Sequence, residues 1–284
     1  MLKRPTPSKT PQSPVVLSGI RLSVPVVQAI LGDCDSVALA VAVSRAGGLG
    51  TLSVNAPDPA YLKRRLKQVR SRTPRPVLLA FTASFEEDAV LDTALQNGFR
   101  AVQVFWWNGP RIAPRVRREG GTVFWQIGTV AEARDAVSAG ADVVVAQGTE
   151  AGGQVRSPRP VLRLIRELRE ALGEGIPIVA GGGFADKHDT QAALEAGANA
   201  AMFGTRFLLS DESNASPRDK TRLLRATADH LQLDSRLVGD WPCCPRRRLR
   251  TATDEEVIGL YAGLGIGRVG TLLPAGQIVR ILAP

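Results

Sequence analysis

Short apolar runs alternate with longer amphipathic stretches along most of the chain. Each run of four to six apolar residues precedes a stretch rich in Ala, Leu, Glu and Arg, often followed by Gly. Runs of this length predict buried strands, and the stretches between them predict helices. The strands are expected to begin near Val26, Leu49, Val77, Ala101, Val123, Val143, Ile176 and Ala200.

Seven helices are predicted between these strands, approximately over residues 36–46, 59–69, 85–97, 110–118, 130–139, 160–172 and 186–195. Four of them are followed within one or two residues by a glycine that can end a helix: Gly47, Gly98, Gly140 and Gly197. Eight strands separated by single helices favour an α/β fold of the (β/α)8 type, a TIM barrel. The alternative is an open Rossmann-like sheet, but no Gly-x-Gly-x-x-Gly follows the first strand.

Both ends of the chain depart from this repeat. Residues 1–14 are rich in Pro, Ser, Thr and Lys and are expected to form a flexible tail. Residues 15–284 are expected to form a single domain, in which 206–284 include a helical and irregular C-terminal extension. Within the extension, helices are predicted over 219–231, 254–262 and 274–282, and an irregular segment over 238–250.

Composition narrows the class of protein. The chain has 284 residues, of which 44% are hydrophobic, enough for a substantial core. Aromatic residues are few, so the core must consist mostly of Val, Ile, Leu and Ala, as parallel sheets prefer. Cys34, Cys243 and Cys244 have neither metal-ligand spacing nor the density of a disulfide scaffold, and we expect unlinked thiols in a reducing cytoplasm.

Neither a membrane nor a nucleic acid is expected as a partner. No apolar run reaches the roughly 18 residues that cross a bilayer, and the N-terminus lacks the apolar centre of a signal peptide. The net charge is +9, but no aromatic residues are interleaved with the Arg and no nucleic-acid motif occurs. The densest basic run, residues 246–250, is interpreted as a solvated face or a contact with the tail, with attraction for an acidic ligand as the alternative.

Three of the predicted strands end in glycine. Residues 143–154, 176–183 and 200–206 each read as a buried strand opening into a loop with exposed main-chain N–H groups. Such groups at one rim of a parallel sheet bind anions, and barrels often hold phosphate in the loops after strands seven and eight. The pattern therefore suggests a phosphorylated cofactor, although the same glycines could serve only to make tight turns.

These loops also resemble a known family. Ala146-Gln-Gly-Thr-Glu-Ala-Gly-Gly153, Ala180-Gly-Gly-Gly-Phe-Ala-Asp186 and Gly197-Ala-Asn-Ala-Ala-Met-Phe-Gly-Thr-Arg-Phe207 resemble the nitronate monooxygenase (2-nitropropane dioxygenase) family of FMN-binding barrels, related to FMN-dependent enoyl-ACP reductases. The resemblance also covers Pro25-Val-Val-Gln-Ala29, Ala46-Gly-Gly-Leu-Gly50 and Leu260-Tyr-Ala-Gly263, and so extends over nearly the whole chain from residue 20.

The resemblance implies that FMN lies across the mouth of the barrel. Its ring is expected near Ala29 and Ile30, and its pyrimidine edge near Gln126, which could instead be an ordinary inward-facing barrel residue. The glycines and threonine expected to contact the cofactor, mainly its phosphate, are Gly152, Gly153, Gly181, Gly182, Gly183, Gly204 and Thr205.

Two positions depart from the family pattern. Gln154 stands where the family has His, and a carboxamide cannot act as a general base, although its NH2 can donate a hydrogen bond to a substrate oxygen. Ala80 stands where the family has Asn beside the flavin, so the flavin loses a partner unless Gln28, Gln103 or Gln126 substitutes.

Few other residues can carry proton chemistry. His188 and His230 are the two histidines, and both are expected on the surface. Glu150 is retained beside Gln154 as a catalytic candidate, although a carboxylate next to a glycine loop commonly caps main chain. Trp106 and Trp107 are expected either to line the mouth or to pack against the C-terminal segment.

The leading functional hypothesis is an FMN-dependent monooxygenase that oxidises a nitronate or another small anionic substrate with O2. A variant of this hypothesis, suggested by Gln154, is that the enzyme has diverged for specialised biosynthesis. One alternative is an enoyl reductase-type flavoenzyme that uses NAD(P)H. Another is a flavin-binding protein without turnover. The chain is expected to act as a monomer or homodimer.

Overall fold

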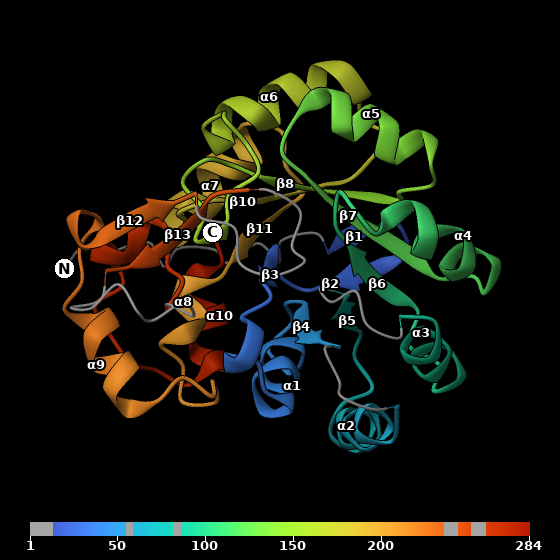
Figure 1. Cartoon of the computed structure of the whole chain (residues 1–284), viewed down its shortest axis with the longest axis horizontal. Helices are drawn as coiled ribbons and strands as arrows, with labels where there is room; N and C mark the ends of the chain where they lie inside the picture. The colour runs from blue at the N-terminus through green and yellow to red at the C-terminus, as the bar shows by residue number, and fades with distance from the viewer. Residues whose placement is uncertain (1–13, 55–58, 82–86, 236–243, 251–259) are drawn as a thin grey trace, which may run out of the picture.

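The computed structural model of the protein describes residues 14–54, 59–81, 87–235, 244–250 and 260–284 (Figure 1). Eight parallel strands form its central sheet, in the order β3-β11-β10-β8-β7-β6-β5-β4. A parallel bridge between Val27 and Leu49 links the two end strands, β3 and β4, and brings the sheet close to closure. The strands are β3 (Val26–Gln28), β4 (Gly50–Ser53), β5 (Val77–Ala80), β6 (Ala101–Val104), β7 (Thr122–Ile127), β8 (Val143–Gln147), β10 (Ile178–Gly181) and β11 (Ala200–Phe203).

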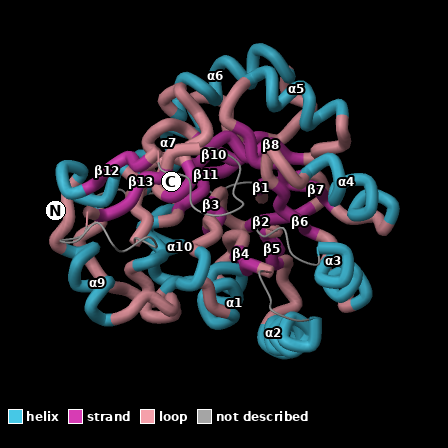
Figure 2. The backbone as a smooth tube through the Cα atoms, viewed as in Figure 1, coloured by secondary structure: helices cyan, strands magenta, loops and turns pink. Residues whose placement is uncertain are grey.

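Helices surround these strands, and Figure 2 shows the strands gathered at the centre with the helices outside them. The predicted (β/α)8 barrel is therefore confirmed, with its eight strands near the expected positions. Among the described residues, no helix has the length and apolar composition that crossing a bilayer requires. The seven helices between the strands are α1 (Val37–Arg45), α2 (Pro59–Arg72), α3 (Glu87–Gln96), α4 (Gly109–Arg118), α5 (Val130–Ser138), α6 (Val161–Leu172) and α7 (Lys187–Glu195).

Strand residues alternate between two apolar layers. Val102 and Val144 belong to the large cluster that packs under the helices, whereas their neighbours Ala101 and Val143 belong to a smaller cluster inside the barrel. This alternation follows from the two-residue period of a strand, and it fixes which side chains reach the interior.

A hairpin before the first barrel strand was not predicted. Strands β1 (Val15–Leu17) and β2 (Ile20–Leu22) pair antiparallel through a tight turn at Ser18 and Gly19, both with positive φ. Leu17 and Leu22 are buried in the same cluster as the inward-facing barrel residues. The hairpin therefore extends the core of the barrel at the end where the strands begin.

The C-terminal extension contains more strand than expected. A three-stranded sheet joins β12 (Leu231–Asp234), β13 (Arg246–Leu249) and β9 (Gly153–Gln154), the last of which lies in the loop after β8. The prediction of an irregular segment over 238–250 is thus wrong at β13. The remaining elements are η1 (Gly32–Cys34), α8 (Thr205–Leu208), α9 (Pro217–Leu224), η2 (Ala228–His230), η3 (Leu264–Arg268) and α10 (Ala275–Leu282).

The three helices predicted in the extension have different outcomes in the structure. The one over 274–282 is confirmed as α10. The one over 219–231 is wrong beyond Leu224, where α9 ends, because the chain then makes a short 3-10 turn and enters β12. The helix predicted over 254–262 lies mostly outside the described residues.

Candidate active site

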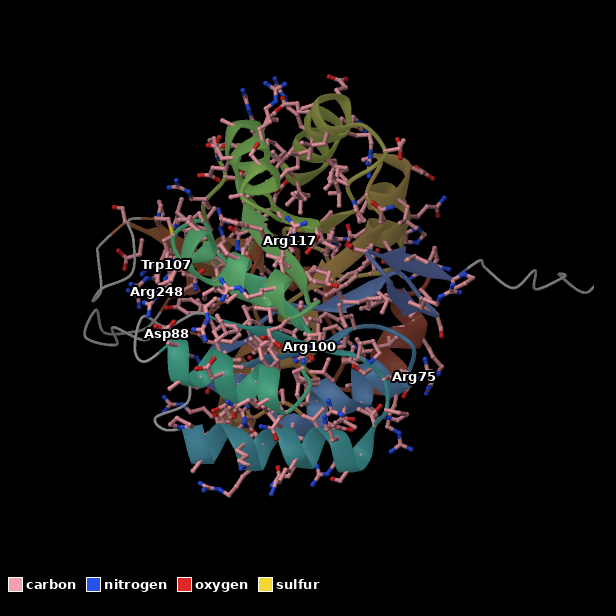
Figure 3. The ribbon with its side chains drawn as sticks, turned by 90° about the vertical axis from the view of Figure 1, so that its right-hand side faces the viewer. Arg75, Asp88, Arg100, Trp107, Arg117 and Arg248 are labelled. Atoms are coloured by element: carbon pink, nitrogen blue, oxygen red, sulfur yellow. The ribbon has the colours of Figure 1, made fainter. Side chains whose placement is uncertain are left out.

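The carboxyl ends of the barrel strands form one end of the molecule, here called the mouth. Figure 3 shows Trp107, which follows β6, and Arg248 of β13 on the same side, with Arg75, which precedes β5, on the opposite side. The extension sheet therefore lies at the mouth. The loops that follow the strands meet at this end.

The three glycine-rich loops are bonded to one another at the mouth. Gly148 N donates to Gly181 O at 2.8 Å, which joins the loops after β8 and β10. Gly263 N donates to Thr205 Oγ1 at 2.9 Å, and Leu264 N donates to Glu150 O at 2.9 Å, so the 263–264 segment joins the loops after β8 and β11. The sequence-predicted loops are thus brought together at one rim.

Main-chain N–H groups remain available on this rim. Gly182, Gly183, Gly204 and Thr205 are half-buried, and within the described parts of the chain their N–H groups have no hydrogen-bond acceptor. A convergent set of such groups is suited to an anion. The residues present therefore fit the phosphate of a cofactor such as FMN.

The glycines also allow close packing. Gly183 has a φ of +66°, and a Cβ there would lie 2.8 Å from Glu150 Cβ. A Cβ on Gly152 would lie 2.5 Å from the main chain of Ala262. By contrast, a Cβ on Gly204 would meet its nearest atom, Ala29 Cβ, at 3.6 Å, an ordinary contact. Tight packing accounts for Gly152 and Gly183 but leaves Gly204 without a packing reason.

Glu150 supports the loop after β8. Its two carboxylate oxygens accept from Val161 N, the first residue of α6, at 3.0 and 3.2 Å. On the other side, Arg247 Nη1 donates to Thr149 O and, at 2.6 Å, to Ala151 O. Burial lowers the pKa of Arg247, and the nearby charge of Glu150 opposes that effect. The Glu150 side chain therefore binds a main-chain N–H group, and this contact does not place it as a general base.

Gln154 is the second residue of β9, an edge strand of the extension sheet. It is paired in register with Arg246, and Cys244 Sγ donates to its Oε1 at 3.6 Å. Cys34 is an unlinked thiol, as expected, and Cys243 lies outside the described residues. Because Cys244 donates to Oε1, the NH2 group of Gln154 points away from Cys244.

The basic run next to Gln154 is not a solvated face, and that interpretation is wrong for three of its residues. Arg246, Arg247 and Arg248 are 8%, 8% and 3% exposed. Arg247 holds main-chain carbonyls, and Arg248 forms an ion pair with Asp234 at 3.1 Å. Pairing of β13 between two strands, together with these acceptors, makes burial of the charges possible.

The histidines lie on the surface. The side chains of His188 and His230 are both exposed, and His230 Nδ1 accepts from Thr227 N at 3.0 Å. The expectation that both histidines lie on the surface is therefore confirmed.

Sequence reasoning missed a polar seam between the first two strands of the barrel. Gln28 Nε2 donates to Thr51 O at 2.9 Å, and Thr51 N donates to Gln28 Oε1 at 3.2 Å. The Gln28 side-chain amide thus makes the two hydrogen bonds that a main-chain peptide group would make, at the place where β3 and β4 share a single bridge. Gln28, one of the three glutamines considered as substitutes at the flavin, is committed to this seam.

Asp35 continues the seam and is 4% exposed. Its Oδ1 accepts from Leu31 N at 3.0 Å and Gln28 Nε2 at 3.3 Å, and its Oδ2 accepts from Ser53 N at 3.2 Å. Burial raises the pKa of this carboxyl to about 8, although the three donors oppose the rise. A single Asp before a predicted helix gave no signal of this role.

The other two glutamines form a pair inside the barrel. Gln103 Nε2 donates to Gln126 Oε1 at 3.0 Å, and both side chains are buried. Gln103 stands in register with Ala80 on the neighbouring strand. The pair therefore lies next to Ala80, the position at which the sequence resemblance predicts Asn.

Trp106 packs beside the loop that follows β8. The Arg156 guanidinium lies 5.6 Å from its ring centroid, and Phe105 meets it edge-on. Its Nε1 is buried and has no acceptor among the described residues. Both expected roles, lining the mouth and packing in the wall, are compatible with this position.

Comparisons with known proteins agree with this geometry. The profile of the family described as nitronate monooxygenase matches residues 102–251. A nitronate monooxygenase of Neurospora crassa is 31% identical, with 86% of this chain and 84% of that protein aligned. A Mycobacterium tuberculosis protein, (3aS,4S,5R,7aS)-5-hydroxy-7a-methyl-1-oxo-octahydro-1H-indene-4-carboxyl-CoA dehydrogenase, is also 31% identical over 82% of this chain, which spans 65% of its length. FabK of Thermotoga maritima shares the fold, with a TM-score of 0.83, 24% identity and 92% of each chain aligned.

Proposed function

Because the chain belongs to the nitronate monooxygenase family of oxidoreductases, we propose that it is an FMN-dependent enzyme that oxidises a small anionic substrate of the nitronate type with O2. The observation that carries the proposal is the set of free N–H groups on Gly182, Gly183, Gly204 and Thr205 at the mouth. The neutral side chain of Gln154 lies on the same side of the barrel.

The residues at the mouth would hold FMN in distinct ways. The free N–H groups would bind its phosphate, because oriented main-chain dipoles favour an anion without a compensating side chain. Ala29, whose Cβ would lie 3.6 Å from a Cβ on Gly204, and Ile30 would lie beside the ring. When bound, FMN supplies the redox step, and the protein supplies orientation and electrostatics.

The substrate would arrive already as an anion. Gln154 cannot take a proton from carbon, the Glu150 carboxylate holds Val161 N, and both histidines are exposed. A nitronate has lost that proton before it binds, so no base is required. The Gln154 NH2 group, directed away from Cys244, can donate a hydrogen bond to a nitronate oxygen.

The test is anaerobic reduction of the FMN-loaded protein, followed by its visible absorbance. Propyl-1-nitronate should bleach the flavin at least about a hundredfold faster than 1-nitropropane at equal concentration, since a general base accounts for about 10²–10⁴ in rate. Admission of O2 should then restore the yellow colour.

Two other results would redirect the assignment. Bleaching by NADH but not by the nitronate would favour the enoyl reductase-type alternative. Stable FMN binding with no bleaching by either reagent would favour a flavin-binding protein without turnover.

A further inference from the structure

The two glutamines inside the barrel are unusually placed for a core of Val, Leu and Ala. Gln103 is the third residue of the four-residue strand β6, and Gln126 the fifth of the six-residue strand β7, so each precedes the carboxyl end of its strand by one residue. The residues on both sides of each glutamine, Val102 and Val104 or Trp125 and Ile127, pack outward under the helices. Both amides therefore point into the barrel near the mouth.

Their mutual hydrogen bond leaves one polar atom without a partner. Gln103 is fully buried, and while its Nε2 donates to Gln126 Oε1 at 3.0 Å, its Oε1 has no donor among the described residues. Its register neighbours are Ala80 on one side and Phe124 on the other, and neither side chain has a donor. Buried acceptors are rarely left unpaired in native proteins, so an external donor is implied.

The chemistry required of that donor is specific. The pyrimidine edge of an isoalloxazine carries one N–H group, at N3, between two carbonyl oxygens. Gln103 Oε1 supplies the acceptor that this N–H needs. Gln126 has its own Oε1 occupied by Gln103, so its NH2 group is the part left to donate to a carbonyl oxygen.

We propose that Gln103 recognises the flavin by accepting a hydrogen bond from N3–H, and that Gln126 fixes the orientation of the Gln103 amide. The inference rests on the proposed binding of FMN. It also accounts for Ala80, because Gln103 stands beside it in register on the next strand and would meet the same edge of the ring. Gln28 cannot serve, since its amide holds Thr51 across the β3–β4 seam.

Apo protein titrated with FMN and with 3-methyl-FMN, followed by flavin fluorescence, tests this assignment. Methylation of N3 removes the donor and places a methyl group against Gln103. The wild-type protein should therefore bind 3-methyl-FMN at least about tenfold more weakly than FMN, the loss expected for one buried hydrogen bond. In Gln103→Ala, FMN itself should bind roughly tenfold more weakly, and the two flavins should bind within about twofold of each other.

Two further variants keep the test decisive. Gln103→Met serves if the alanine variant folds poorly, because it keeps the length of the side chain without the acceptor. It should also bind FMN and 3-methyl-FMN with nearly equal affinity. Gln191→Ala makes the same change at an exposed position of α7 and should behave as wild type. The melting temperature of each variant reports its folding.

The outcomes separate the inference from the function on which it rests. An equal penalty for 3-methyl-FMN in wild type and Gln103→Ala, or no penalty in wild type, would overturn the role of Gln103 while leaving FMN binding intact. Failure of the wild-type protein to bind FMN at all would overturn both.

Discussion

A few buried polar side chains distinguish this barrel from a generic one. Asp35 is an example: its carboxyl oxygens accept hydrogen bonds from Leu31 N, Ser53 N and the Gln28 amide at the seam between β3 and β4. The loop so fastened follows Ala29 and Ile30, which are expected beside the flavin ring. Asp35 would thus be a positioning residue for the proposed cofactor site, although nothing in the local sequence marks it as one.

The raised pKa of Asp35 makes a prediction about stability. Folding raises the pKa from its ordinary 3.8 to about 8, so the folded state binds the proton more tightly than the unfolded state. The contribution of Asp35 to the free energy of unfolding is therefore fully present below pH 4 and is lost as pH rises through about 8. Between pH 5 and pH 9, roughly the span of that titration, wild type should lose at least about 2 kcal/mol relative to Asp35→Asn, which cannot ionise.

Urea unfolding of both proteins across this pH range measures that difference. The hydrogen bond that Asn cannot accept from Ser53 N should lower stability by a similar amount at every pH, so the pH-dependent part is diagnostic. A difference in the free energy of unfolding that stays constant with pH would show that burial does not destabilise the ionised form of Asp35.

Gln154 carries the second prediction at this scale. In Gln154→His an imidazole would stand at the position where the sequence resemblance predicts a histidine, and a positioned base contributes about 10²–10⁴ in rate. Turnover of 1-nitropropane should rise at least about tenfold, with turnover of its nitronate changed little. Gln154→Asn, which supplies no base, is the matched control for oxygen consumption. If the histidine variant still binds FMN but turns over 1-nitropropane no faster, the surroundings of residue 154 do not position an imidazole as a base.

At the scale of elements, strand β13 departs most from sequence expectation. An Arg-rich run looks solvated because isolated buried charges are costly. Here β13 is held between β9 and β12, and it buries its cations against carbonyl groups and Asp234. These partners are up to 98 residues away in sequence, beyond the reach of any local pattern.

The barrel itself was predictable for the opposite reason. Strand and helix periodicity are local, and every barrel strand lies near its expected start. The turn glycines Gly47, Gly98, Gly140 and Gly197 all have positive φ, as the prediction of helix ends requires. The polar seam and the Gln103–Gln126 pair were not predictable, because they depend on which strands become neighbours in the barrel.

Arg247 tests the role of β13. Arg247→Met keeps the apolar stem but leaves Thr149 O and Ala151 O without their donor, which should lower the free energy of unfolding by about 1–3 kcal/mol. FMN affinity should fall as well, because the loop that carries Gly152 and Gly153 is loosened.

The matched control for this change is Arg222→Met on α9, whose half-buried side chain lies 3.5 Å from Asp219. It should change stability by no more than about 0.5 kcal/mol. Equal effects of the two variants, measured by urea unfolding and flavin fluorescence, would argue against a special role for Arg247.

The whole molecule has two unlike ends. The β1–β2 hairpin extends the apolar interior where the strands begin, whereas the glycine-rich loops and the extension sheet gather polar groups where the strands end. Ligand chemistry therefore belongs at the mouth, as in other (β/α)8 barrels. The excess of positive charge over the whole chain adds a weak attraction for an anionic cofactor or substrate.

The central claim is that main-chain N–H groups at this mouth hold the phosphate of a flavin. Titration of the apo protein with FMN and with riboflavin, which lacks only the phosphate, tests it most directly. FMN should bind at least about a hundredfold more tightly, because several charge-assisted hydrogen bonds depend on that group. Equal affinity for the two flavins would contradict the account.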